Sequence, residues 1–252
     1  MKTAVIIPAR YSSTRFPGKP LIELLKKPMI IWVAEIASQA VGKENVFIAT
    51  DDYQIKRLVE KYKFKSVITN KNHLTGTDRV AEAAEKIDAD IFVNLQGDEP
   101  LVEPKNINKI IHWKIKNLDK VINGFCYLSN SEDPKNINIP KVITNEENKL
   151  IYMSRSAIPG SKSKPLTQNN YKKQVCIYAF TLEELKKFRL FGRKSVLEEK
   201  EDIEILRFLE INKEILMVKL PSGSLAVDIP DDIPKVEEKL KTKKDKIYHT
   251  NI

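Results

Sequence analysis

The chain has 252 residues, of which 42% are hydrophobic and 31% are charged, and its formal net charge at pH 7 is +9. This composition is typical of a globular protein with a large core and excludes an intrinsically disordered chain. No apolar run approaches the roughly 18 residues of a membrane-spanning helix, and the first apolar stretch is too short for a signal peptide. The sequence therefore predicts no membrane association and a cytoplasmic location.

The basic charge is compatible with two kinds of partner, nucleic acid or an acidic small ligand. The sequence contains no recognised nucleic-acid-binding motif and no basic stripe interleaved with aromatic residues, so we expect an acidic ligand and no nucleic acid. The two cysteines, Cys126 and Cys176, lie far apart in the sequence. They exclude a disulfide framework and a structural zinc site.

The first half of the chain alternates strand-like and helix-like segments. Apolar runs predict strands over 3–9, 45–50, 66–69 and 90–95. Apolar spacing of three and four residues predicts helices over 27–41, 51–63 and 77–87, the last beginning near Thr77 or Asp78. This alternation is typical of a Rossmann-like α/β fold, with a doubly wound, mostly parallel sheet and helices on both faces. Ligands bind at the carboxyl ends of the strands in such folds.

The second half is less regular. Residues from about 120 to 165 mix strand-like pieces with a polar run, which predicts an inserted β-ribbon suited to a dimer arm. A buried strand is expected over 174–180, a helix over 195–210, and a strand, turn and final helix over 225–240. No internal repeat or long linker is present, so the sequence predicts one α/β domain spanning 1–252, with about 120–165 protruding.

The loop after the first strand carries three cations, Arg10, Arg15 and Lys19, among small residues. Backbone N–H groups and cations together suit a polyphosphate, although a basic surface loop is the plainer alternative. The segment is not a Walker A loop, because Lys19 is followed by Pro20.

Two aspartates follow strand-like runs, Asp98 in NLQGDEP and Asp228 in LAVDIPDD. Each is compatible with a turn or cap, but carboxylates at strand ends also suit a hard divalent cation that phosphate oxygens complete. Beside three cations they favour metal-assisted nucleotidyl transfer.

Five motifs, PARYSSTRFPGKPL, HLTGTDRVAEA, NLQGDEP, YMSRSAIP and AVDIPDD, resemble in order those of the bacterial 3-deoxy-manno-octulosonate (KDO) cytidylyltransferases. The resemblance runs from residue 1 to about 240. It implies the nucleotide-diphospho-sugar transferase type of fold, a homodimer through the middle segment, and Mg²⁺ as cofactor. It also implies the reaction, in which CTP and a 3-deoxy-2-ulosonic acid give a CMP-sugar and pyrophosphate.

Residue roles follow from the matched motifs. The resemblance places the triphosphate on Arg10, Arg15 and Lys19, with Mg²⁺ on Asp98 and Asp228. The catalytic set is then Lys19, Arg10, Asp98 and Asp228. The cytidine is framed by Ala9, Gly76 and Gln96, with His73 at its border. The sugar pocket is lined by Arg155, which would meet the sugar carboxylate, and by Gln174, Tyr178, Glu201 and Glu204.

The chain departs from the family pattern on the sugar side. Gln174 stands where the family commonly has His, and Ile205 stands where it commonly has Gln. These differences leave KDO, 8-amino-KDO and a nonulosonic acid open as substrates. A nucleic-acid-binding protein and a catalytically silent scaffold are further alternatives, and intact Lys19, Asp98 and Asp228 argue against the scaffold.

Overall fold

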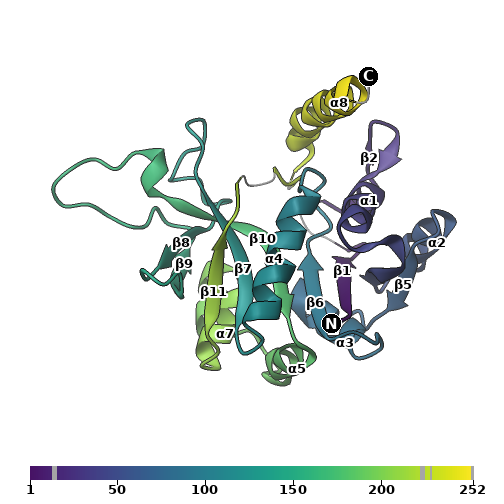
Figure 1. Cartoon of the computed structure of the whole chain (residues 1–252), viewed down its shortest axis with the longest axis horizontal. Coiled ribbons are helices and arrows are strands. Elements are labelled where there is room, and N and C mark those ends of the chain that lie inside the picture. Colours follow the sequence, from purple (N-terminus) through teal and green to yellow (C-terminus); the bar gives the residue numbers. More distant parts are fainter. Residues whose placement is uncertain (13–15, 222–224, 228, 251–252) are drawn as a thin grey trace.

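The computed structural model describes residues 1–12, 16–221, 225–227 and 229–250, and the side chains of 243–250 lie outside that description. Its main sheet has the strand order β11-β7-β10-β6-β1-β4-β5 (Figure 1). The parallel core consists of β1 (Thr3–Ala9), β4 (Val46–Thr50), β5 (Lys65–Ile68) and β6 (Ile91–Leu95). The predicted doubly wound, mostly parallel sheet is confirmed.

The other half of the sheet is mixed. β7 (Val121–Tyr127) and β11 (Ile215–Lys219) run parallel to each other. β10 (Lys172–Phe180) lies between β7 and β6 and is antiparallel to both. The carboxyl ends of β1, β6 and β7 therefore meet the amino end of β10 at one edge of the sheet, which is the upper edge in Figure 1.

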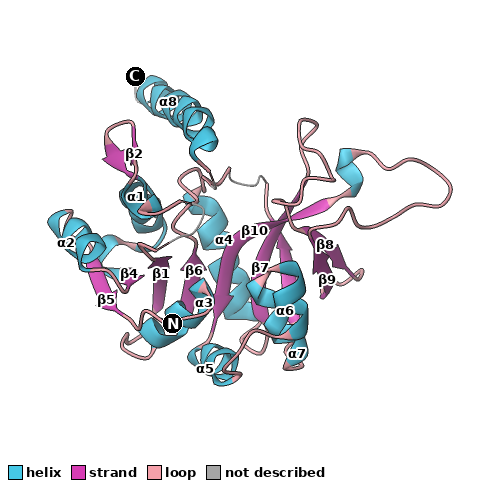
Figure 2. Cartoon of the chain, turned by 180° about the vertical axis from the view of Figure 1, so that it is seen from behind, coloured by secondary structure: helices cyan, strands magenta, loops and turns pink. Residues whose placement is uncertain are grey.

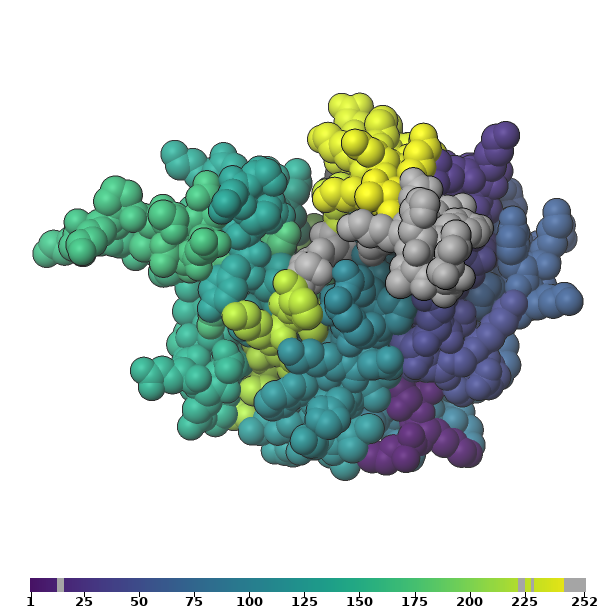
Figure 3. All heavy atoms as spheres, turned by 45° about the horizontal axis from the view of Figure 1, so that its top comes forward, coloured from purple at the N-terminus to yellow at the C-terminus, as the bar shows by residue number. Residues whose placement is uncertain are grey.

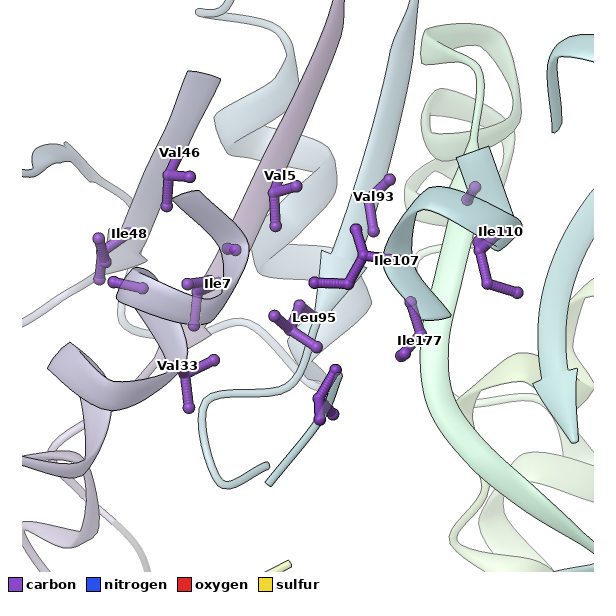
Figure 4. Packing of buried hydrophobic residues seen from close by; sticks show 14 of the residues in the cluster. Val5, Ile7, Val33, Val46, Ile48, Val93, Leu95, Ile107, Ile110 and Ile177 are labelled. Carbon is purple, nitrogen blue, oxygen red and sulfur yellow. The ribbon is translucent and has the colours of Figure 1, made fainter. Parts of the chain in front are cut away.

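Helices cover both faces because the strands are apolar on both sides. On one face, α1 (Met29–Val41), α2 (Tyr53–Lys61) and α4 (Pro104–Lys116) pack against the residues shown in Figure 4, among them Val5, Ile48 and Leu95. The opposite face, seen in Figure 2, carries α3 (Gly76–Ala84), α5 (Leu182–Leu190), α6 (Val196–Glu201) and α7 (Arg207–Glu210).

Two helix boundaries differ from the sequence-based expectation. Helix α3 begins earlier than Thr77, because Thr75 is its cap and accepts a hydrogen bond from the Asp78 N–H at 3.1 Å. The helix expected over 195–210 is interrupted at Asp202, whose φ of 49° is left-handed. A short 3₁₀ turn, Glu204–Leu206, then leads into α7.

A two-stranded ribbon extends the sheet beside β10. It consists of β8 (Lys141–Thr144) and β9 (Leu150–Ser154), and β8 pairs with the amino-terminal part of β10. Together with the loops around it, the ribbon projects from the molecule in Figures 1 and 3. Within the expected segment 120–165, β7 is an interior strand, so the projecting part begins after Tyr127.

The last helix, α8 (Ile233–Thr250), packs over the carboxyl edge beside the hairpin of β2 (Glu23–Leu24) and β3 (Lys27–Pro28). A separate apolar cluster joins them and includes Trp32, Val227 and Leu240. Residues 225–227, expected as a strand, lie outside the strands, but the Val227 N–H donates to the Asp98 carbonyl at 3.0 Å. Among the described residues, no helix is long and apolar enough to cross a membrane.

Candidate active site

The predicted functional loops meet at the carboxyl edge of the sheet. The loop after β1 and the turn after β6 are in contact, since a Cβ on Gly97 would lie 3.0 Å from the Pro8 carbonyl oxygen. A Cβ on Gly76, the first residue of α3, would lie 3.4 Å from the Pro8 side chain. The motifs that are distant in sequence therefore form one site.

Lys19 and Asp98 form an ion pair at the centre of this edge. The Lys19 Nζ lies 2.6 Å from Asp98 Oδ2 and 2.9 Å from the Val227 carbonyl oxygen. Gly18 turns the loop with a left-handed φ of 69°, and its N–H donates to the Tyr11 carbonyl at 2.9 Å. This turn aims Lys19 at the end of β6, so two predicted catalytic residues lie side by side.

The remaining cations of the loop are less defined. Arg10 is exposed directly after β1, and Ala9 is the last residue of that strand. Burial lowers the pKa of Arg79 in α3, and the positive charge of Arg10 lowers it further, although Asp51 opposes both. Arg10 therefore lies close enough to α3 to add its field there. Arg15 lies outside the described residues.

The site offers oxygen ligands of the kind that Mg²⁺ prefers. Asp98 presents a carboxylate that is 26% exposed, and Mg²⁺ is usually held by one or two carboxylates together with substrate phosphates and water. This donor set fits Mg²⁺. Across the described residues, no three His, Cys, Asp or Glu side chains gather to hold an ion by themselves. Asp228, the second predicted ligand, lies outside them.

Gly76 and Gln96 are in contact, as their shared predicted role requires. A Cβ on Gly76 would lie 3.3 Å from Gln96 Nε2 and 3.4 Å from Gln96 Oε1. The absence of a side chain at Gly76 therefore lets the glutamine amide approach the start of α3.

Glu204 lies beside Gln96 and also reaches helix α3. Its Oε1 accepts a hydrogen bond from Gln96 Nε2 at 2.9 Å, and its Oε2 accepts one from the Thr77 N–H at 2.9 Å. Burial raises the pKa of Glu204, while the hydrogen bonds from Thr77 and Thr75 act in the opposite direction. The predicted sugar-site residue Glu204 thus contacts a predicted nucleotide-site residue.

Glu201 and Arg155 form a second unit beside the ribbon. The Glu201 carboxylate accepts hydrogen bonds from the Ser154 hydroxyl at 2.7 Å and from the Arg155 N–H at 2.8 Å. Burial alone would raise the pKa of Glu201, but hydrogen bonds from Arg155, Ser154 and Tyr152 hold it below its ordinary value.

The guanidinium of Arg155 contacts backbone carbonyls. It donates to Glu201 at 2.5 Å, to Ile137 at 2.9 Å and to Asp202 at 2.9 Å. These contacts tie the ribbon to α6. The expected role of Arg155 toward a sugar carboxylate stays a prediction.

Gln174 and Tyr178 lie on β10, on either side of an irregularity in its pairing with β7. The Gln174 Nε2 donates to Asn123 Oδ1 at 3.1 Å, and Asn123 donates in turn to the Val175 and Ile177 carbonyls, each at 2.9 Å. Tyr178 is buried against Phe180, and burial raises its pKa well above the ordinary value.

Ile205 and His73 have structural surroundings. Ile205 is buried in the second core cluster, so the side chain at this departure from the family pattern packs in the core. The His73 Nε2 lies 2.6 Å from Glu82 Oε2. Burial would raise the pKa of Glu82, but hydrogen bonds from Lys86, Asn70 and His73 lower it to about 2. His73 thus ties its loop to α3.

The sequence reasoning missed several polar residues beneath the site. Asn94 and Asn123 are fully buried in β6 and β7, and Arg207 is fully buried between Asp78 and Glu198. An asparagine inside an otherwise apolar strand-like run, as in IFVNL and VINGFCY, was the available signal. The partners of Arg207 lie 129 and 9 residues away, and no local pattern indicated the longer pairing.

The fold and the site are those of a nucleotidyltransferase, and comparison with known proteins agrees. The chain matches the family model described as "Cytidylyltransferase" over residues 4–215. The chain therefore belongs to the cytidylyltransferase family, a class of nucleotidyltransferases.

Individual relatives are similar along almost their whole length. The chain is 33% identical over 235 residues to the 3-deoxy-manno-octulosonate cytidylyltransferase of Escherichia coli, covering 93% of this chain and 94% of that protein. It is 37% identical over 251 residues to the 8-amino-3,8-dideoxy-manno-octulosonate cytidylyltransferase of Shewanella baltica, covering 95% and 99%. A solved CMP:2-keto-3-deoxy-manno-octonic acid synthetase complexed with CTP superimposes with a TM-score of 0.88 at 32% identity, covering 96% of this chain and 100% of that one.

Proposed function

We propose that this protein transfers CMP from CTP to the anomeric hydroxyl of a 3-deoxy-2-ulosonic acid, KDO in the first instance, and releases pyrophosphate. The observation that carries the proposal is the Lys19–Asp98 pair at the carboxyl edge of the sheet. Relatives named for KDO and for 8-amino-KDO, together with a similar structure that binds CTP, support this choice of substrates.

The nucleotide half of the site lies along β1, α3 and the end of β6. In the proposal, Ala9, Gly76 and Gln96 frame the cytidine, with the His73 loop beside it, and Arg10, Arg15 and Lys19 hold the triphosphate. The short Lys19–Asp98 distance of 2.6 Å supports the role of Lys19. A cation held next to the end of β6 is placed to stabilise charge that develops on phosphate oxygens.

Mg²⁺ is the proposed cofactor, held by Asp98 and Asp228 together with phosphate oxygens. When bound it supplies charge neutralisation to the triphosphate. Lys19 and the carboxylate then act on the same group, because Lys19 neutralises Asp98 in the absence of ligand and contacts the phosphates in its presence.

The sugar half is proposed to involve Arg155, Gln174, Tyr178, Glu201 and Glu204. Arg155 would meet the sugar carboxylate by exchanging one of its carbonyl partners, Ile137 or Asp202, for the ligand. Since these carbonyls belong to the ribbon side and to the break between α6 and α7, sugar binding would order both segments.

The reaction needs little covalent participation from the protein. The anomeric oxygen forms a bond to the α-phosphorus, the bond from that phosphorus to the bridging oxygen breaks, and pyrophosphate leaves. Lys19 and Arg10 hold the leaving phosphates in line with the attacking oxygen. Gln96 and the sugar-side residues orient the two substrates toward each other.

The same transfer to 8-amino-KDO is the second candidate. It is supported by the relative of that name, whose identity of 37% exceeds the 33% of the KDO enzyme of Escherichia coli. The Gln174–Asn123 hydrogen bond is a feature of this pocket on which the choice would depend.

A pyrophosphate-release assay tests the proposed function. The purified protein is given CTP, Mg²⁺ and, in separate reactions, KDO, 8-amino-KDO or a nonulosonic acid. We expect release that requires both CTP and an ulosonic acid. Release with KDO but not the amino sugar would select the first candidate, the reverse would select the second, and inertness toward every acid would overturn the proposal.

A further inference from the structure

The orientation of the Gln96 side-chain amide is fixed by its neighbours. Its Nε2 lies 2.9 Å from Glu204 Oε1 and 3.4 Å from Asn94 Oδ1. Both neighbours are hydrogen-bond acceptors, so the NH₂ end of the amide must face them. The amide oxygen Oε1 therefore points away from Glu204, while the plane of the amide rests against Gly76.

Glu204 uses its two carboxylate oxygens for two different tasks. Oε1 accepts from Gln96, and Oε2 accepts from the Thr77 N–H in the first turn of α3 at 2.9 Å. A carboxylate can satisfy both donors because it carries acceptors only. A glutamine in its place has one acceptor oxygen, so it would leave either Gln96 or Thr77 facing another donor.

The two contacts join segments that are far apart in sequence. Glu204 follows Asp202, the left-handed residue at which the expected helix breaks, and the 3₁₀ turn Glu204–Leu206 begins with it. Gln96 is 108 residues away and Thr77 is 127 residues away. The break between α6 and α7 thus delivers one carboxylate to the end of β6 and the start of α3.

We propose that Glu204 is a positioning residue that holds the Gln96 amide with its NH₂ turned inward, so that Oε1 is presented to the substrate as a hydrogen-bond acceptor. The inference rests on the proposed function for the identity of the substrate. The group that Oε1 accepts from must be a donor, either the exocyclic amine of cytosine or a hydroxyl of the sugar acid. Uracil carries a carbonyl where cytosine carries the amine, so the first case would reject UTP.

The variant Glu204→Gln tests the inference. Because the introduced amide leaves one donor unmatched, we expect Gln96 to rotate and present its NH₂ in part of the molecules. The CTP-over-UTP ratio of kcat/KM, or kcat/KM for the sugar acid at saturating CTP, should fall by about 10-fold or more. A change in the first quantity assigns Oε1 to the base, and a change in the second assigns it to the sugar. Wild-type values for both would overturn the inference.

A compensating double variant separates positioning from a general structural effect. In Glu204→Gln/Gln96→Glu, the introduced glutamine accepts from Thr77 and donates to the introduced glutamate, whose second oxygen again faces the substrate. We expect most of the lost selectivity or sugar kcat/KM to return. A uniform loss of activity in the single variant with no recovery in the double variant would contradict the inference, even if the single variant folds poorly.

Two controls complete the experiment. Glu183→Gln changes an exposed carboxylate of α5 and should leave all parameters unchanged. Calorimetric binding of CTP and UTP to each variant requires no turnover. If the wild-type protein releases no pyrophosphate, the proposed function fails, yet a changed CTP-over-UTP preference in the single variant would still support the positioning role of Glu204.

Discussion

At the scale of single residues, the site depends on Lys19 and Asp98 being neighbours. Their side chains are 18% and 26% exposed, so the pair is shielded from water but open to a ligand. In such surroundings an ammonium and a carboxylate interact more strongly than on the surface. Each also has a proposed partner in the triphosphate–metal complex, which explains why they lie together without serving stability alone.

Replacing Lys19 tests its role at this scale. Lys19→Met removes the cation that we expect to stabilise phosphate charge, so kcat/KM for CTP should fall by about 100-fold or more. Steady-state pyrophosphate release with varied CTP measures the change. The matched control is Lys187→Met, which removes the lysine of an exposed ion pair in α5. Equal activity in both variants would refute the assignment.

The Glu82 carboxylate provides a pH-dependent test. Its folded-state pKa of about 2 lies below the ordinary value of 4.5, so Glu82 contributes stability above pH 4.5 and loses that contribution as the pH falls toward 2. Glu82→Gln should lower the free energy of unfolding by about 1–3 kcal/mol at pH 7. Urea unfolding at pH 7 and pH 3 should show this difference shrinking at the lower pH, and a constant difference would exclude the ionised carboxylate as its source.

At the scale of elements, a buried ion network connects α3 with the segment that carries Glu204. The Arg207 guanidinium lies 2.7 Å from both Asp78 in α3 and Glu198 in α6, and it stacks over the Phe188 ring of α5 at 3.8 Å. The arginine is fully buried. Removal of one member of such a network leaves the other charges buried and uncompensated.

Arg207→Met should therefore be strongly destabilising. We expect a loss of about 3–5 kcal/mol in the free energy of unfolding. The comparison is Arg189→Met, which breaks the surface pair with Glu85 and should cost about 1 kcal/mol or less. Urea unfolding of both variants decides the point, since similar small losses would mean that the buried network contributes little.

The sequence predicted the parallel half of this fold well, because each strand there is a continuous apolar run. It failed where the decisive contact is distant. The break at Asp202 cannot be seen in SVLEEKEDIEILRFLE, whose apolar spacing suits one helix, because the Asp78–Arg207–Glu198 network and the α3 contact of Glu204 are tertiary. The Thr75 cap was missed because three candidate capping residues follow closely.

The site followed the same division. The Lys19–Asp98 pairing was predictable as a shared location, since strand ends of a doubly wound sheet converge. The Gln96–Glu204 contact was not, because it joins residues 108 positions apart through a turn that no local pattern indicates. For Arg155, a local motif identified the residue but did not reveal its three carbonyl partners.

At the scale of the whole molecule, the projecting ribbon is the feature that a lone chain does not explain. Ile137 is 66% exposed and Ile151 is 57% exposed on this part of the molecule. Apolar side chains that are exposed on a projection are typical of an interface. We therefore propose that the ribbon forms a homodimer.

Ile137→Glu/Ile151→Glu should weaken this dimer, because two carboxylates would have to be desolvated in the interface. Light scattering after size-exclusion chromatography should give a dimer mass for the wild type and a shift toward the monomer mass for the variant. The pair Lys56→Glu/Lys61→Glu on α2, away from the ribbon, serves as the control. An unchanged mass for the ribbon variant would place the interface elsewhere.

The central claim is that the Lys19–Asp98 edge of the sheet transfers CMP. The most direct measurement is pyrophosphate release by the wild type and by Asp98→Asn, with CTP, Mg²⁺ and KDO or its 8-amino derivative. The account predicts release by the wild type that depends on both substrates, and a loss of about 100-fold or more in the variant. Release by Asp98→Asn at the wild-type rate, or release by neither protein with any ulosonic acid, would contradict it.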